Sequence, residues 1–505
     1  MSNLFHKKRI EENIADVWKG REDNWCLWWH GNWWTWRQLN NLAIDCEQKI
    51  AAKGFGKGER IAILLPNSPM FFALSLAAWR LGGTVAPLNG RLNPINLMST
   101  INMLDVDAVF VFDGKINNPE VIEKTIGVPV VMTPVDTPIL KDFQMRRGTP
   151  EDCETAVIFS TSGTSGLPKA VPCTHSNILG NMKDVPYAAP GIVSTDSVFL
   201  NVLPNFHALG CNTSGYLPLL FGSRQAVMPS FIPVANTIEA IKTAKVNIII
   251  AVPTLMSFIL ADLAKNDEKI EGVRFIVCGG DRLNTQLDER CRKYLGVGIL
   301  EGYGLTECSP IVAFNPSMQG RKLGTVGPRF GHLEAEIHDR DGKKIGLHDE
   351  GILWLKGPAV VNRYFRDEIN TKERFHGGWF DTGDVVRIDN DGYITIVDRA
   401  TDIIIVGGFN VYPQEVETVL CSHHAVSNAV AVGEPNNVTG ELVKAFIILK
   451  DGASATPKEI IDYCRTKLAH YKVPRQIAFV KEYPLSSTGK VLRRELRKIK
   501  IDNKY

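Results

Sequence analysis

A segment rich in small hydroxyl-bearing residues and glycine follows a buried-strand pattern in the first third of the chain. The apolar run 156–159 predicts the strand, and almost all of the eight residues that follow it (160–167) are Ser, Thr or Gly. Glycines let backbone N–H groups turn toward one point, while hydroxyls and an ammonium group add further donors. The candidate donors are Thr161, Ser162, Gly163, Thr164, Ser165, Gly166 and Lys169. They predict a cradle for a polyphosphate.

This segment has two other interpretations. The spacing excludes a Walker A loop, because Pro168 stands where that motif has the Gly before its Lys. A flexible Ser/Gly linker has a similar composition. A linker does not normally follow a buried strand directly, so the phosphate-binding interpretation is favoured.

The segment resembles the phosphate loop of the adenylate-forming superfamily, which contains acyl-CoA synthetases, peptide-synthetase adenylation domains and beetle luciferases. Six further segments match motifs of that family in the same order. They are 203–210 (LPNFHALG), 278–281 (CGGD), 302–307 (GYGLTE), 378–384 (GWFDTGD), 398–408 with its Asp-Arg and Gly-Gly pairs, and 487–490 (STGK). The ordered set is highly specific and covers essentially the whole chain, which is most similar to AMP-forming acyl-CoA synthetases.

The resemblance implies how the chain would bind ATP. The adenine base would be framed by Gly279, Gly280, Asp281, Gly302, Tyr303 and Gly304. Asp384 would accept both ribose hydroxyls, and Arg399 would reach the same sugar. The alternatives are an Asx-turn cap for Asp384 and an ion pair with Asp398 or Asp402 for Arg399.

The resemblance also implies which residues take part in the chemistry: Lys490, Glu307, Thr306 and His207. A carboxylate and the α-phosphate are both anions, so their reaction needs positive charge and donors. Lys490 would bridge the two anions, although such a basic run is usually a solvated helix face. Glu307 and the hydroxyl of Thr161 would hold Mg²⁺, which prefers hard oxygen ligands, and Thr306 would contact the α-phosphate.

His207 bears on the class of acid. Amino-acid-activating relatives carry an Asp near this position to hold the substrate ammonium group, whereas 203–210 contains no carboxylate. We therefore expect an acid without an α-amino group, with a fatty acid as the first candidate and aryl or short branched acids left open. His207 would gate the route between the acyl pocket and the thiol tunnel. A buried histidine with satisfied hydrogen bonds is the alternative.

The predicted function is an ATP-dependent, AMP-forming acyl-CoA synthetase that uses ATP, Mg²⁺ and CoA. Gly407 and Gly408 would line the pantetheine tunnel, and 315–345 lacks the long insertion that marks fatty acyl-AMP ligases without CoA activity. The alternatives are an acyl-AMP ligase that loads a carrier protein and a non-catalytic acyl- or nucleotide-binding relative. A homodimer is left open.

Composition agrees with a multi-domain enzyme. A chain of 505 residues exceeds what one hydrophobic core usually serves. A net charge of +2 gives no reason to expect nucleic-acid binding, and the ten cysteines form no CxxC pair, so neither a disulfide framework nor a zinc site is expected. Pro253 interrupts the most apolar stretch, 247–263, and the N-terminus is polar. We therefore expect no transmembrane segment and a cytoplasmic protein.

The order of elements predicts a fold of the α/β and α+β classes. Strands at 60–65, 84–88 and 107–112 alternate with helices and predict βαβ-type subdomains. Short strands after residue 351 predict a β-rich subdomain. The domain prediction is a large AMP- and acyl-binding domain over 1–398, a hinge over 399–402, and a small mobile α+β domain over 403–505 that carries Lys490. The tryptophan-rich segment 28–34 predicts a hairpin with paired indoles, followed by a helix that opens at Thr35. An aromatic patch for a partner or lipid is the alternative to packing.

Overall fold

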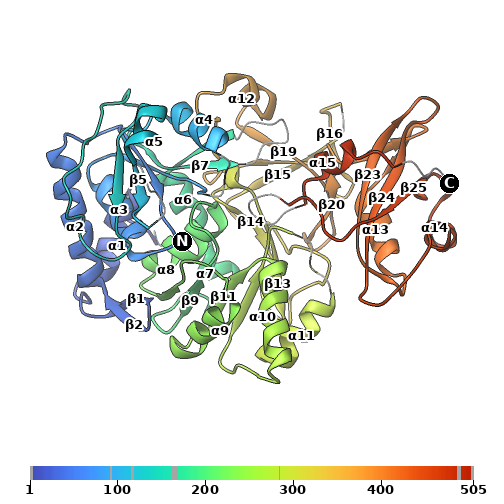
Figure 1. Cartoon of the computed structure of the whole chain (residues 1–505), viewed down its shortest axis with the longest axis horizontal. Coiled ribbons are helices and arrows are strands. Elements are labelled where there is room, and N and C mark those ends of the chain that lie inside the picture. The colour runs from blue at the N-terminus through green and yellow to red at the C-terminus, as the bar shows by residue number, and fades with distance from the viewer. Residues whose placement is uncertain are drawn as a thin grey trace. The chain divides into compact units, whose positions relative to one another are not determined.

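The computed structural model describes residues 4–90, 92, 94–114, 119–161, 169–281, 283, 285–339, 341–485 and 491–501 (Figure 1). The chain forms two compact units. Unit 1 comprises Met1–Ala335, Leu355–Phe380 and Asp391–Ile394, and unit 2 comprises Glu336–Trp354, Asp381–Asn390 and Thr395–Tyr505.

Unit 1 contains a six-stranded sheet in the order β6-β5-β3-β4-β7-β8. Its strands are β3 (Arg60–Leu64), β4 (Thr84–Pro87), β5 (Ala108–Phe112), β6 (Val130–Thr133), β7 (Thr155–Thr161) and β8 (Lys169–Thr174). All neighbours run parallel except β7 and β8, which are antiparallel. The associated helices are α2 (Trp36–Ala52), α3 (Pro69–Arg80), α4 (Pro94–Leu104) and α5 (Pro119–Ile126). Ser68 caps α3, which is apolar on all sides and almost wholly buried.

A second, eight-stranded sheet of unit 1 has the order β14-β13-β12-β11-β9-β10-β1-β2. Its inner strands β9 (Val198–Asn201), β10 (Arg224–Val227), β11 (Ile248–Ala251), β12 (Phe275–Cys278) and β13 (Ile299–Gly304) are parallel, and β14 (Ile311–Phe314) closes one edge antiparallel to β13. Helices α9 (Val234–Thr243), α10 (Pro253–Lys265) and α11 (Thr285–Leu295) lie side by side (Figure 1). The carboxyl ends of β11, β12 and β13 therefore share one edge of the sheet.

The predicted tryptophan hairpin is confirmed. Strands β1 (Trp25–Trp29) and β2 (Asn32–Thr35) pair antiparallel around a turn in which His30 and Gly31 have φ of 46° and 87°. The rings of Trp25 and Trp33 stack with centroids 5.5 Å apart. We call residues 25–35 the Trp hairpin. The preceding helix α1 (Ile10–Trp18) was not predicted.

The remaining short helices of unit 1 are α6 (His175–Met182), α7 (Val185–Ala188), α8 (Leu217–Leu220) and α12 (Glu368–Arg374). The predicted β-rich region contains β15 (Glu334–His338), β16 (Lys344–Ile345), β17 (Gly351–Lys356), β18 (Phe375–His376), β19 (Trp379–Ile388) and β20 (Ile394–Arg399). Strands β15, β17, β19 and β20 carry residues of both units.

Unit 2 contains the predicted small α+β fold. A sheet in the order β22-β21-β24-β23, with β25 beside β24, is formed by β21 (Ile404–Val406), β22 (Phe409–Val411), β23 (Val426–Asn436), β24 (Gly440–Leu449) and β25 (Gln476–Phe479). Helices α13 (Pro413–Cys421), α14 (Pro457–Arg465) and α15 (Arg493–Lys498) and a 3₁₀ turn (His470–Lys472) complete it. Its core includes Val416, Leu420, Ala445 and Ile460. The predicted fold class is confirmed.

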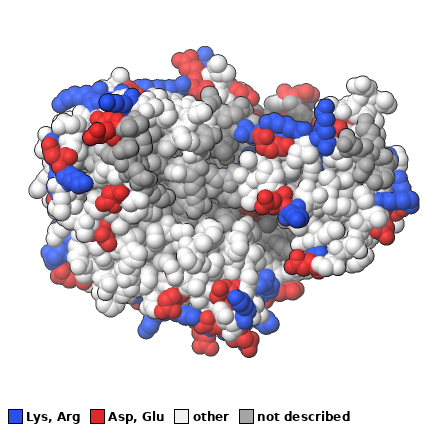
Figure 2. Space-filling view, in the orientation of Figure 1, with Lys and Arg blue, Asp and Glu red and all other residues white. Residues whose placement is uncertain are grey.

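Surface charges of both signs are interspersed on the face shown in Figure 2. This agrees with the near balance of 57 basic and 55 acidic residues in the sequence. Among the described residues, no helix is both long enough and apolar enough to cross a membrane.

A buried ion pair joins α11 to the loop after β14. Arg321 donates from Nη1 and Nη2 to Asp288, at 2.6 and 2.7 Å, and the two side chains are only 6% and 5% exposed. Burial alone would raise the pKa of Asp288, but hydrogen bonds from Arg321 and from the N–H of Ile299 outweigh it and hold that pKa well below its usual range. The pair fixes the helix beside β13.

Asp288→Asn should lower unfolding free energy by about 3–5 kcal/mol, because it leaves a buried guanidinium without its counter-charge. Calorimetric melting of the full chain is the measurement. The loss should shrink as pH falls below about 4, where the unfolded carboxyl also takes up its proton. Asp23→Asn, which breaks an ion pair with side chains 76% and 54% exposed, is the control and should lower the unfolding free energy far less, because solvent screens that pair. Equal losses in both variants would contradict the prediction.

Candidate active site

The two ends of the predicted phosphate loop lie beside each other in unit 1. Thr161 ends β7 and Lys169 begins β8, and they are partners in the antiparallel pair. The hydroxyl of Thr161 donates to the carbonyl of Lys169 at 3.4 Å. Ser162, Gly163, Thr164, Ser165 and Gly166 lie outside the described residues.

Glu307 lies in a 3₁₀ turn (Thr306–Cys308). Its carboxylate is held by Tyr364, a residue that the sequence motifs did not indicate. The hydroxyl of Tyr364 donates to Glu307 Oε1 at 2.8 Å. Burial, and then the Glu307 carboxylate, raise the pKa of Tyr364 well above its usual value, so the phenol stays protonated and can donate. The Nζ of Lys169 lies 4.9 Å from the Tyr364 ring centroid. One aromatic side chain thus connects two predicted site residues.

A second contact brings the same two segments together. The thiol of Cys173, on β8, donates to the carbonyl of Thr306 at 3.6 Å. The N–H of Phe365 donates to the carbonyl of Ala170 at 2.8 Å, so the segment that carries Tyr364 also lies along β8. Lys169, Thr306 and Glu307 therefore belong to one assembly, which we call the Lys169–Glu307 cluster and which includes Tyr364.

The oxygen atoms available in this cluster are suitable ligands for magnesium. Tyr364 occupies Oε1 of Glu307, and Oε2 of Glu307 has no hydrogen-bond partner among the described residues. In that part of the chain no group of three His, Cys, Asp or Glu side chains is placed to hold a metal. Mg²⁺ is commonly bound by one or two carboxylates together with waters and substrate phosphates. A single carboxylate and a hydroxyl near the phosphate loop therefore suit it.

Backbone contact between two strand ends explains the glycines of the predicted adenine site. Strands β12 and β13 are parallel neighbours, and a Cβ atom on Gly279 would lie only 3.1 Å from the carbonyl of Gly302. A Cβ on Gly304 would lie 2.3 Å from the carbonyl of Pro310, so side chains are excluded there. Gly280 and Asp281 follow β12 directly, and Tyr303 lies on β13. These six predicted residues therefore lie at the neighbouring carboxyl ends of β12 and β13.

His207 lies two residues before a π-helix (Leu209–Tyr216). Its Nδ1 accepts a hydrogen bond from the N–H of Leu209 at 3.3 Å, which leaves Nε2 as the protonated nitrogen of the neutral ring. The imidazole is half-buried. π-Helical turns are rare and often occur at functional sites.

Neutral amides hold this segment in place. Asn67 donates to Asn201 Oδ1 at 3.0 Å and to the carbonyl of Leu203 at 2.8 Å, and its Oδ1 accepts from the N–H of Asn205 at 2.8 Å. Asn212, in the π-helix, donates to the carbonyl of Ser309 at 3.3 Å, two residues after Glu307. The His207 segment is thereby tied to the Glu307 turn without any charged group.

Unit 2 holds the predicted ribose-binding pair. Arg399 Nε lies 3.2 Å from Asp384 Oδ1, and the two side chains are 50% and 4% exposed. Asp384 is thus a buried carboxylate with a partly exposed guanidinium beside it. Asp398 instead accepts from the N–H of Arg399 at 2.8 Å, and burial raises the pKa of Asp398 to about 6. Arg399 therefore makes its ion pair with Asp384.

The other predicted residues of unit 2 are placed only in part. Gly407 and Gly408 form the turn between β21 and β22, with φ of 59° and 83°. Lys490 lies outside the described residues, whereas Leu485 and Val491 on either side of that gap pair with each other. Arg493, which follows in the same basic run, is not on a solvated helix face, because Glu417 binds it at 2.5 Å and its side chain is 22% exposed.

Comparison with known proteins identifies the family. Residues 14–365 match the model of the AMP-binding enzyme family, and residues 415–490 match that of the AMP-binding enzyme C-terminal domain. A long-chain-fatty-acid–CoA ligase of Yersinia pestis is 30% identical over 88% of this chain and 86% of its own length. The corresponding enzyme of Bacillus subtilis is 27% identical over 99% of this chain and 96% of its own.

Two solved structures have the same fold. ATP-bound MatB from Rhodopseudomonas palustris superposes with a TM-score of 0.85 and 25% identity, covering 97% of this chain and 98% of that one. The o-succinylbenzoate CoA synthetase MenE of Bacillus subtilis with its acyl-adenylate intermediate gives a TM-score of 0.84 and 27% identity, covering 98% and 99%. With both family models matched in order, the chain belongs to the AMP-binding enzymes of the adenylate-forming superfamily and is similar to their acyl-CoA synthetases.

Proposed function

We propose that this chain is an ATP-dependent, AMP-forming acyl-CoA synthetase whose acid is a fatty acid. The observation that carries the proposal is the Lys169–Glu307 cluster, in which Tyr364 contacts both a candidate phosphate-binding cation and a candidate metal ligand. The long-chain-fatty-acid–CoA ligases among its relatives support the choice of acid.

The reaction has two balanced steps. A carboxylate oxygen of the acid attacks the α-phosphorus of ATP, the bond to the pyrophosphate leaving group breaks, and acyl-AMP forms. The sulfur of CoA then attacks the acyl carbon, AMP leaves and the thiol proton is released. Lys490 and Thr306 would stabilise the charge that develops at the α-phosphate, and Lys169 would contact the outer phosphates. Mg²⁺, held by Glu307 and Thr161, would supply charge neutralisation at the phosphates.

The nucleoside would be held by the two other groups of residues. Without side chains at Gly279 and Gly280 the backbone would lie close to one face of the base, and Tyr303 would offer an aromatic ring to the other face. Asp384 would accept hydrogen bonds from the ribose hydroxyls, with Arg399 orienting its carboxylate.

The acid would lie along the segment that carries His207. Residues 203–216 contain no Asp or Glu, so a substrate ammonium group would find no counter-charge there. We therefore propose acids without an α-amino group, with His207 gating access of the thiol, and Gly407 and Gly408 lining the pantetheine path.

The change between the two steps would use a hinge at 399–402, between domains spanning 1–398 and 403–505. In unit 2, Arg497 Nη2 donates to the carbonyl of Thr401 at 3.2 Å and to Asp402 Oδ1 at 3.1 Å. These bonds must be exchanged if the backbone dihedrals of 399–402 change, which is what a short hinge requires.

A panel of acids assayed for AMP release, with and without CoA, tests the proposed function. Medium- and long-chain fatty acids should support AMP release that depends on CoA, and free amino acids should not. Release that requires a carrier protein instead of CoA would favour the acyl-AMP ligase. Absence of both AMP release and ATP–pyrophosphate exchange with every acid would indicate the non-catalytic relative.

Tyr364→Phe tests the metal site. The ring under Lys169 remains, but Glu307 loses the hydrogen bond that orients it, so the Mg²⁺ concentration for half-maximal pyrophosphate exchange should rise roughly tenfold. Tyr187→Phe, at a side chain that is 60% exposed, is the matched control. An unchanged Mg²⁺ dependence in Tyr364→Phe would show that Glu307 does not hold the metal.

Lys490→Ala tests the division of labour between the two steps. Acyl-AMP formation should fall by about a hundredfold or more, because the cation at the meeting point of two anions is lost. Conversion of supplied acyl-AMP to acyl-CoA should be nearly unchanged. Equal loss of both half-reactions would mean that the lysine is structural.

A further inference from the structure

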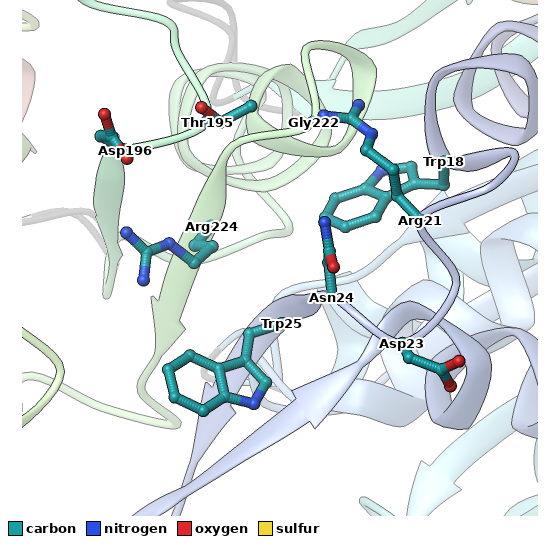
Figure 3. A pocket seen from close by; sticks show the side chains of 9 residues that line it. All are labelled: Trp18, Arg21, Asp23, Asn24, Trp25, Thr195, Asp196, Gly222 and Arg224. Carbon is teal, nitrogen blue, oxygen red and sulfur yellow. The ribbon is translucent and has the colours of Figure 1, made fainter.

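A pocket of about 350 Å³ lies at the base of the Trp hairpin, in unit 1 (Figure 3). It is lined by Trp18, Arg21, Asp23, Asn24, Trp25, Thr195, Asp196, Gly222 and Arg224. We call it the hairpin pocket. Thr195 and Asp196 precede β9, Arg224 begins β10 and Trp25 begins β1, so the pocket lies at the amino ends of parallel strands. The glycines assigned to adenine lie at the carboxyl ends of strands in the same sheet, which makes the two sites distinct.

The charged groups around the hairpin pocket do not cancel. Arg37 binds both oxygens of Asp23, at 2.7 and 3.0 Å, so that carboxylate is already neutralised. Arg21 is anchored by Nε and Nη2 on the carbonyl of Val17, at 3.1 and 2.6 Å. Two guanidinium groups, Arg21 and Arg224, therefore face a single remaining carboxylate, that of Asp196. The pocket has an excess of positive charge.

Arg224 has unused donors. Its side chain makes no hydrogen bond or ion pair with any residue in the described part of the chain, and its Nε is buried without a partner there. Its guanidinium carbon lies 5.5 Å from the Trp33 ring centroid, which helps to hold the cation in place. The Nη groups of Arg224 are not buried, so an anion that enters the pocket can accept hydrogen bonds from them.

An aromatic surface lies next to this cation. Trp25 stacks on Trp33 at 5.5 Å with 9° between the ring planes, yet 52% of Trp25 is exposed. In Figure 3 the Trp25 ring and the Arg224 guanidinium lie on the same side of the hairpin pocket, with Asn24 across from them. A flat ring on a ligand can stack on an exposed indole while an attached anion reaches the guanidinium.

We propose that the hairpin pocket binds a small organic anion in which a phosphate or carboxylate is attached to an aromatic ring. Arg224 pairs with two oxygens of the anion, Arg21 adds charge, and the ring stacks on Trp25. Asn24 and Thr195 also line the pocket, and their amide and hydroxyl groups are hydrogen-bond donors for such a ligand. The pocket volume is within the range of sites for small molecules. This proposal is independent of the reaction proposed above.

Isothermal titration calorimetry with four probes tests it. Phenyl phosphate and benzoate carry both the ring and the anion, inorganic phosphate lacks the ring, and phenol lacks the charge. At least one of the first two should bind with one-to-one stoichiometry, at least about tenfold more tightly than either single-feature probe. The tighter of the two identifies the anion as phosphate or carboxylate.

Two variants locate the binding. Arg224→Gln and Trp25→Leu should each weaken that binding at least about tenfold while leaving acid-dependent pyrophosphate exchange at the wild-type rate. Arg387→Gln, which changes an arginine that is 62% exposed and does not line the pocket, should bind as the wild type does. Trp25→Leu alters an exposed ring, so it keeps the test valid if Arg224→Gln fails to fold.

Three results would overturn the proposal. One is the absence of binding by both ring-bearing anions at millimolar concentration. Another is binding that survives unchanged in both variants, because the probe would then occupy another site such as the phosphate loop. The third is equal affinity for inorganic phosphate and phenyl phosphate together with no effect of Trp25→Leu, since the aromatic contact would then contribute nothing.

Discussion

The hydrogen bond from Tyr364 to Glu307 is the contact on which the arrangement of the phosphate side of the site depends. A half-buried carboxylate needs a donor or a cation to offset its lost hydration. Tyr364 provides the donor, and the face of the same ring accommodates the Lys169 ammonium. Segments more than one hundred residues apart in the chain are thereby fixed together, with opposite charges separated by an aromatic ring. Among the described residues, the second oxygen of this carboxylate and the lysine ammonium have no hydrogen-bond partner, as the proposed metal and phosphate contacts require.

The adjoining segment is organised by neutral groups instead. Asn67, Asn201 and Asn212 position the His207 segment through amide hydrogen bonds. Amide side chains hold a backbone segment by hydrogen bonds and add no net charge. The charge near a bound acid would therefore come from the lysines and the metal. A charged scaffold at the same place would compete with the substrate for these cations. The arrangement suits an enzyme that must bring two anions together.

The parallel sheet explains why one layer offers two different sites. At its carboxyl edge, glycines let neighbouring strand ends approach closely, as Gly279 and Gly302 show. At its amino edge, the Trp hairpin adds large side chains on an antiparallel extension, and the hairpin pocket forms beneath them. Strand direction keeps the two edges apart, because every strand between them runs the same way.

The sequence by itself determined the family, the fold class and the identity of most candidate site residues, because motifs and strand periodicity are local properties. Adjacent residues such as Gly279 and Gly280, or Thr306 and Glu307, could be assigned together for that reason. It could not indicate Tyr364, whose partners Glu307 and Lys169 are distant in the chain and whose own neighbours form no motif. Nor could it show that Arg493 is an ion-pair partner of Glu417, or that Arg224 and Trp25 share a pocket. Only the tertiary structure decided these contacts, since they depend on which strands become neighbours and on which side chains burial leaves without water.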